Sequence, residues 1–197
     1  SRVTVGNGNQ EMSIDEGTLA SGDPVTNVTM TIDAGTQIKG QTGSFANLII
    51  TRGSMLMAEG TADAPIVFSS DDAGFDGAGE WGGLIMHGYA PHNECLTADQ
   101  GAVACNVDSE GESGFGGGYS PDDSSGVLRY VIVTEGGFEF ATGNEINGIS
   151  LIGVGSGTEM EYIQVNGNAD DGIEFYGGSV SVRYMVLTGN QDDSVDW

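Results

Sequence analysis

The chain has 197 residues, of which 34 are glycine and 4 are proline, and its 29 acidic and 5 basic side chains give a net charge of −24. A surface this acidic repels nucleic acid and anionic membranes, suits solubility in salt, and attracts divalent cations and basic partners. No apolar run approaches the about 18 residues that span a membrane, and the glycines follow no collagen-like period.

The first residues are weakly patterned, and we expect residues 1–24 to form the capping segment that the end of a solenoid requires. From residue 25 to residue 197, short apolar or alternating runs are separated by turn residues. This pattern predicts an all-β domain with many short strands. The clearest strands predicted in the first half are residues 28–32, 37–39, 48–50, 66–68 and 84–86.

A stretch rich in glycine, serine and aspartate interrupts this pattern at residues 88–125, which predicts a loop insertion on one face. Cys95 and Cys105 lie ten positions apart within it. In an exported protein this spacing predicts a local disulfide that contributes about 2–3 kcal/mol, and two free thiols are the alternative. We therefore expect a protein that is secreted or displayed on the outer cell surface.

The two histidines are close to this insertion. His87 follows a predicted strand and His92 lies in the adjoining loop. A zinc site needs at least a third protein ligand, and the pattern supplies none. Structural or surface roles are therefore favoured for both side chains.

Internal repeats dominate the C-terminal part of the chain. One repeated motif begins with Gly-Asn, at offsets of 24 and then 22 residues. A second repeated motif has a central tyrosine, and its last two copies are also 22 residues apart. The copies are residues 143–149 (GNEINGI), 167–173 (GNADDGI) and 189–195 (GNQDDSV) for the first motif, and 128–133 (LRYVIV), 160–165 (MEYIQV) and 182–187 (VRYMVL) for the second.

A period of 22–24 residues suits one coil of a solenoid, made of two or three short strands joined by turns. The sequence therefore predicts a right-handed parallel β-helix over residues 25–197, with equivalent residues of neighbouring coils about 4.8 Å apart. Strand alternation places Met160, Tyr162 and Gln164, or their neighbours, inside.

Motifs spread over most of residues 30–197 carry a family resemblance. They are residues 35–41, 57–68, 81–85, 143–148, 154–158, 170–175 and 192–197. Together they resemble exported right-handed parallel β-helix proteins of Gram-negative, often marine, bacteria, which are mostly described as hypothetical or lipoprotein-like. The resemblance implies the fold and export, and no settled activity. Relatives continue past the last motif, so we expect either a fragment or an open end that receives another subunit.

Superposing the repeats stacks carboxylates in neighbouring coils. The pairs are Asp170 over Asp192, Asp171 over Asp193, and Glu174 over Asp196. Like charges about 5 Å apart repel unless something neutralises them. Converging carboxylate oxygens suit Ca²⁺, so our hypothesis is that Ca²⁺ bridges adjacent coils at these six residues. In the alternative, some of the aspartates hydrogen-bond turn amides and others face water.

Two functions are compatible with these carboxylates. The favoured one is a non-catalytic binding or scaffold protein, supported by Ca²⁺, with a glycan or protein ligand and with self-association through the open end of the solenoid. The alternative is a polysaccharide-degrading enzyme, a hydrolase or lyase, with Asp171 and Asp193 as the catalytic pair. One lysine and four arginines equip the chain poorly to hold a polyanionic substrate.

Overall fold

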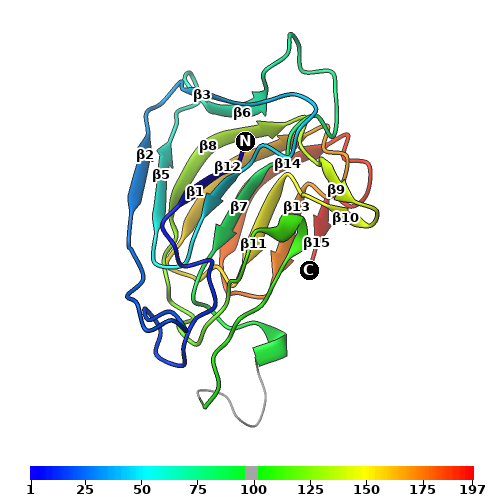
Figure 1. The fold of residues 1–197 in the computed structure, drawn as a ribbon. Helices are drawn as coiled ribbons and strands as arrows, with labels where there is room; N and C mark the ends of the chain where they lie inside the picture. The colour runs from blue at the N-terminus through cyan, green and yellow to red at the C-terminus, as the bar shows by residue number, and fades with distance from the viewer. Residues whose placement is uncertain (96–101) are drawn as a thin grey trace.

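The computed structural model describes residues 1–95 and 102–197, and its strands wind around one core in long parallel sheets (Figure 1). Within the described residues, a six-stranded parallel sheet forms the first face. Its strands, in spatial order, are β1 (Val3–Val5), β4 (Leu48–Ile50), β7 (Leu84–His87), β11 (Ile149–Ile152), β13 (Ile173–Tyr176) and β15 (Val195–Asp196).

The second and third faces belong to one continuous seven-stranded parallel sheet. Its three longest strands each pass through a corner. Their first halves lie in the second face, and their second halves lie in the third. The strands are β2 (Thr29–Ile32), β5 (Met55–Glu59), β8 (Gly126–Thr134), β12 (Glu159–Asn166) and β14 (Ser181–Thr188), with β3 (Gln37–Gly40) and β6 (Ile66–Ser70) on the third face only. This arrangement is the predicted parallel β-helix.

The register of neighbouring coils matches the repeats in the sequence. Ile149 pairs with Ile173, and Ile173 pairs with Val195, so the offsets of 24 and 22 residues are confirmed. Met160 pairs with Leu128 on one side and with Val182 on the other, as the second motif predicted. The capping role of residues 1–24 stays a prediction; within that range, β1 pairs with β4.

The predicted inward set of β12 is wrong beyond its first member. Met160 is buried, but Tyr162 is 38% exposed, and the inward residues after it are Ile163 and Val165. The reason is a left-handed backbone at Tyr162, with φ of 57°, which turns the strand through a corner and shifts the alternation by one residue. The equivalent tyrosines share this conformation and stack on it: Tyr130 and Tyr184 have ring centroids 4.4 and 4.6 Å from that of Tyr162.

A further pair of strands and two short helices lie in the long connections. The strands β9 (Glu139–Ala141) and β10 (Asn144–Glu145) form an antiparallel hairpin, and the 3₁₀ helices are η1 (Asn93–Cys95) and η2 (Glu110–Glu112). Residues 96–101 of the predicted insertion lie outside the described residues. The remainder of the insertion packs on the outer side of the first face, where Gly116 comes so close that a Cβ atom there would lie 2.5 Å from Ile152 Cγ2.

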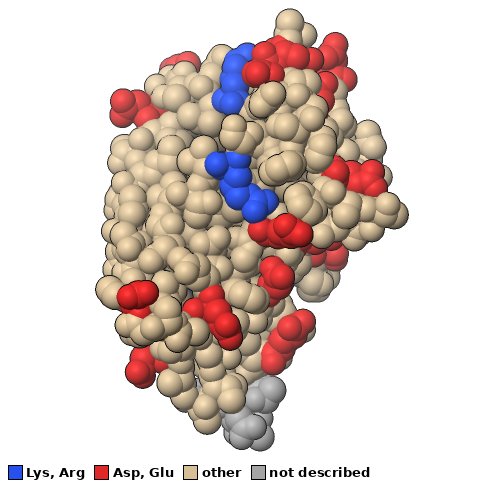
Figure 2. Space-filling model, viewed as in Figure 1, with Lys and Arg blue, Asp and Glu red and all other residues tan. Residues whose placement is uncertain are grey.

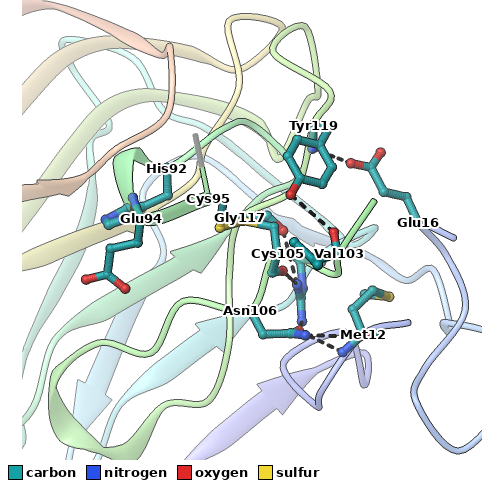
Figure 3. Close-up of a disulfide and its surroundings, with 11 residues drawn as sticks. Met12, Glu16, His92, Glu94, Cys95, Val103, Cys105, Asn106, Gly117 and Tyr119 are labelled. Atoms are coloured by element: carbon teal, nitrogen blue, oxygen red, sulfur yellow. Dashed lines mark hydrogen bonds between the residues drawn. A yellow bond between two sulfur atoms is a disulfide. The ribbon is translucent and has the colours of Figure 1, made fainter. Parts of the chain in front are cut away.

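The predicted disulfide is present at the base of this insertion (Figure 3). Cys95 and Cys105 are joined at an S–S distance of 2.08 Å. Next to the bond, Asn106 exchanges two hydrogen bonds with the main chain of Met12, and the Tyr119 hydroxyl donates to the carbonyl of Val103 at 3.1 Å. The disulfide therefore closes a loop within the insertion, and the bonds of Asn106 beside it join the insertion to the N-terminal segment.

A buried arginine also joins the insertion to the N-terminal segment. Arg52 has no exposed surface, and burial lowers its pKa to about 10. Its guanidinium donates hydrogen bonds to the carbonyls of Gly8, Gln10, Cys105 and Gly117 and to the side chain of Asn106, at 2.7–3.1 Å. One side chain thus joins the second coil, the N-terminal segment and the insertion.

Candidate functional site: a carboxylate cluster beside the first face

The predicted carboxylates lie at one corner of the β-helix, where each coil turns into the first face. Asp170 and Asp171 belong to the turn between β12 and β13, and Asp192 belongs to the turn between β14 and β15. Glu174 on β13 pairs with Asp196 on β15. The stacking that the repeats predicted is therefore present for this last pair in the strand register.

Carboxylate oxygens from adjacent coils come together in two sets. One set contains Asp170, Asp171 and Asp192, and the other contains Asp171, Glu174 and Asp196; within each set, one oxygen per residue lies within 4.8 Å of the others. Two oxygens on opposite sides of a Ca²⁺ ion lie about 4.6–5.2 Å apart, since each bond is about 2.3–2.6 Å long. Both sets therefore fit the ligand shell of that ion.

Asp193 is the one predicted ligand that joins neither set. It is exposed, and its main-chain N–H donates a hydrogen bond to Asp171 Oδ1 at 2.8 Å. Asp171 itself is buried, at 6% exposure, and its own carbonyl accepts from the side chain of Asn168 at 2.7 Å. The main chain of the outer coil therefore orients the carboxylate that both sets share.

Two further carboxylates extend the site, and sequence reasoning missed both. Glu110 from η2 and Glu145 from β10 form a third set with Asp170, again within 4.8 Å. Glu110 belongs to the insertion and Glu145 to a hairpin, so no repeat aligned them with the stacked carboxylates. We call the whole group the acidic cluster; its members are Glu110, Glu145, Asp170, Asp171, Glu174, Asp192 and Asp196.

Neutral side chains hold the inner part of the acidic cluster together. Asn147 Nδ2 donates to Glu174 Oε2 at 2.6 Å and lies 3.4 Å from Glu110 Oε2. The hydroxyl of Tyr176 donates to the same Glu110 oxygen at 3.1 Å. These contacts bring the carboxylate of the insertion against that of β13.

Burial and mutual repulsion raise the pKa values of these carboxyls. Burial, then the charge of Glu174, raises the pKa of Glu110 from 4.5 to about 7. Burial, then the charge of Asp171, raises the pKa of Asp170 from 3.8 to about 6. The pKa values of Asp171 and Glu174 are raised as well, with burial as the largest cause. Each upward shift means that ionising the carboxyl costs more free energy in the folded protein than in water.

No basic side chain in the described chain forms an ion pair with the acidic cluster. The ion pairs among the described residues are made by Arg129 and Arg183. These two side chains contact Glu59, Glu159 and Glu161 on the second face at 2.6–4.0 Å. Acidic side chains are likewise spread widely over the face shown in Figure 2, and basic ones are few and grouped. The acidic cluster therefore lacks an internal counter-charge.

An open pocket of about 490 Å³ adjoins the acidic cluster. Glu174 and Tyr176 line it from β13, and Trp197, which is 88% exposed, lines it from beyond β15. His92 is also in its wall, whereas His87 is fully buried and lies 3.1 Å from the hydroxyl of Ser113. Among the described residues, neither histidine belongs to a set of potential metal ligands.

The coiled parallel sheets and the stacked carboxylates define a parallel β-helix protein with a candidate cation site. The chain belongs to the family of pectate-lyase-like β-helix domains, whose model matches residues 18–197. No curated protein and no solved structure matches the chain. The β-helix family is thus confirmed, while the origin in exported bacterial proteins stays a prediction.

The location of the protein is constrained by the same structure. Disulfides persist in oxidising compartments, so the Cys95–Cys105 bond favours an extracytoplasmic protein. No helix in the described part of the chain is long and apolar enough to cross a membrane.

Proposed function

We propose that this protein is a non-catalytic β-helix, secreted or displayed on the cell surface, that binds Ca²⁺ through the acidic cluster and a glycan in the adjoining pocket. The observation that carries the proposal is the shared position of Asp171, which belongs to both inter-coil sets of carboxylate oxygens. A cation there gains ligands from adjacent coils and offsets their repulsion. Ca²⁺ binding therefore stabilises the stack as well as the ligand site.

A glycan is the ligand class that best fits the pocket. Phe175, Tyr176 and Trp197 line it, and aromatic side chains provide apolar surface for the C–H faces of sugar rings. Membership in a pectate-lyase-like family supports a carbohydrate ligand. A glycan that carries carboxylates needs Ca²⁺ to bridge it to a protein of net charge −24. Protein ligands and self-association through the end of the solenoid stay predictions.

The charges around the acidic cluster favour binding over lyase chemistry. A lyase must abstract a proton beside a substrate carboxylate and stabilise the resulting charge, usually with a cationic or imidazole group. Within the described residues, Arg129 and Arg183 are engaged on the second face. Burial lowers the pKa of His92, although the charge of Glu94 opposes this, so the histidine of the pocket does not supply the positive charge that would stabilise the substrate anion.

Calorimetric titration of the metal-free protein with Ca²⁺, together with a glycan array, tests this function. We expect Ca²⁺ binding that Asp171→Asn weakens at least about tenfold, because both sets lose a negatively charged ligand. Asp193→Asn is the matched control, since it changes an exposed aspartate of the equivalent turn. On the array, we expect glycan binding that chelation abolishes. Equal effects of the two variants, or glycan binding that ignores chelation, would contradict the proposal.

One observation favours glycoside hydrolysis as a second candidate. Glu110 has a pKa of about 7, as a general acid requires, and Glu174 faces it across Asn147. The two Oε2 atoms lie 3.4 and 2.6 Å from Asn147 Nδ2, so their separation cannot reach the about 6.5–9.5 Å of inverting enzymes and is compatible with the about 5–5.5 Å of retaining ones. Turnover of a polysaccharide that is lost in both Glu110→Gln and Glu174→Gln would establish this alternative.

A further inference from the structure

A second group of carboxylates lies at the corner between the second and third coils and shares no residue with the acidic cluster. Asp72 follows β6, Glu80 precedes β7, and Glu135 follows β8. One oxygen from each lies within 4.8 Å of the others. We call these three residues the corner site.

The main chain holds the corner site in place. The N–H of Glu80 donates to the carbonyl of Glu135 at 2.9 Å, and the indole N–H of Trp81 donates to the carbonyl of Thr134 at 2.7 Å. These bonds fix the end of the β6–β7 loop against the end of β8. Bonds to the main chain of the neighbouring coil therefore hold the backbone of Glu80 beside that of Glu135.

Glu135 provides a second observation, because one oxygen of its buried carboxylate lacks a hydrogen-bond partner among the described residues. Its side chain has no exposed surface. Its Oε2 atom accepts from the main-chain N–H and hydroxyl of Ser70 at 3.2 and 3.3 Å, but its Oε1 atom has no hydrogen-bond partner among residues 1–95 and 102–197. Glu80 Oε2 is also buried without a partner in the same part of the chain. A buried charged oxygen without a partner is costly, so such atoms normally meet a donor or a cation.

The charges that face Glu135 are of the same sign. Glu80 and Asp72 are the charged groups that raise its pKa, in addition to burial. The hydroxyl of Ser70 lies 2.8 Å from Asp72 Oδ1, so this neutral donor is shared between two carboxylates. None of the ion pairs in the described chain involves the corner site. A divalent cation is a partner that these oxygens could share, because hard cations bind carboxylate oxygens.

We propose that Asp72, Glu80 and Glu135 bind a divalent cation of the Ca²⁺ type at the corner between two coils. The ion occupies the side on which the buried oxygens of Glu80 and Glu135 lack partners. Asp72 closes the site from the solvent side, where water completes the shell of six to eight oxygens. The site ties the β6–β7 loop to β8 and leaves the acidic cluster free for its own ligands.

Terbium luminescence tests the corner site separately from the acidic cluster. Tb³⁺ occupies Ca²⁺ sites and emits when a nearby tryptophan is excited. Trp81 adjoins Glu80, and the only other tryptophan, Trp197, adjoins the acidic cluster. We would therefore use the Trp197→Phe, Asp171→Asn protein as the background. Excitation of its single tryptophan should produce Tb³⁺ emission that Ca²⁺ displaces.

Variants made in this background decide the assignment. Glu135→Gln keeps the shape of the buried side chain and should abolish the sensitised emission, and Glu80→Gln, at a half-buried position, provides the same test if Glu135→Gln fails to fold. Asp76→Asn is the matched control, because it neutralises an exposed carboxylate of the same loop outside the corner site. Absence of sensitised emission in the background protein, or emission that persists in the folded Gln variants, overturns the proposal. Loss of emission in Asp76→Asn to the same extent overturns it as well.

Discussion

The metal-free protein should become more stable as the pH falls from about 8 to about 5, and replacing Glu110 with glutamine should weaken this dependence. Glu110 has a folded-state pKa of about 7 against 4.5 in the unfolded chain, so the folded protein binds the extra proton between these values. The stability that protonation contributes is fully present below about 4.5 and is lost as the pH rises through about 7. Asp170 acts in the same direction, with a pKa of about 6.

The magnitude follows from the size of this pKa change. A rise from 4.5 to about 7 corresponds to about 3 kcal/mol in a fully shielded site. Because Glu110 is only half-buried, solvent screening reduces the effect to about 1–2 kcal/mol. For a chain of this size, that free energy corresponds to a change in melting temperature of about 2–8 °C.

Chemical denaturation of the wild-type and Glu110→Gln proteins in a chelating buffer, at several pH values, measures the difference. Glu11→Gln is the control, since Glu11 is exposed and belongs to none of the carboxylate sets of the acidic cluster. Addition of Ca²⁺ should flatten the wild-type profile, because the cation replaces the proton as the counter-charge. Parallel pH profiles for wild type and Glu110→Gln would refute the reasoning about mutual repulsion in the acidic cluster.

Three further predictions concern the frame that holds the site. Arg52→Met should lower the free energy of unfolding by about 3–5 kcal/mol, because several buried carbonyls lose their donor; Arg183→Met, at an exposed ion pair, should change it by less than about 1 kcal/mol in the same denaturation assay. Cys105→Ser should cost about 2–3 kcal/mol and expose the insertion to proteases, and an unchanged digestion pattern would contradict this. Tyr162→Ile should be less stable than Tyr162→Asn by about 1 kcal/mol in thermal melts, since asparagine tolerates the left-handed backbone and a β-branched residue does not; equal melting temperatures would exclude this strain.

The repeated part of the fold was predictable because each coil solves the same packing problem. The stacked strands around Leu128, Met160 and Val182 need the same inward positions, so their sequences align and their register follows. The corner at Tyr162 was not predictable by alternation, because a left-handed tyrosine is uncommon and nothing in strand periodicity marks it. Its threefold recurrence in the second motif was the available signal.

The acidic cluster was predictable only where it repeats. Asp171 and Glu174 were found because their equivalents lie one period further along the chain. Glu110 comes from a segment without a period, and its position depends on how the insertion folds onto the first face. Arg52 and Glu135 were missed for a different reason: charged side chains are normally exposed, so a fully buried one is visible only in the structure.

The most direct test of the central claim, that stacked carboxylates form a Ca²⁺ site, is an anomalous difference map from crystals grown with Ca²⁺. We expect a peak between the last two coils, with Asp171, Glu174 and Asp196 at bonding distances of about 2.3–2.6 Å. A map without a peak there, with these carboxylates in contact only with water and turn amides at a saturating Ca²⁺ concentration, would contradict the account.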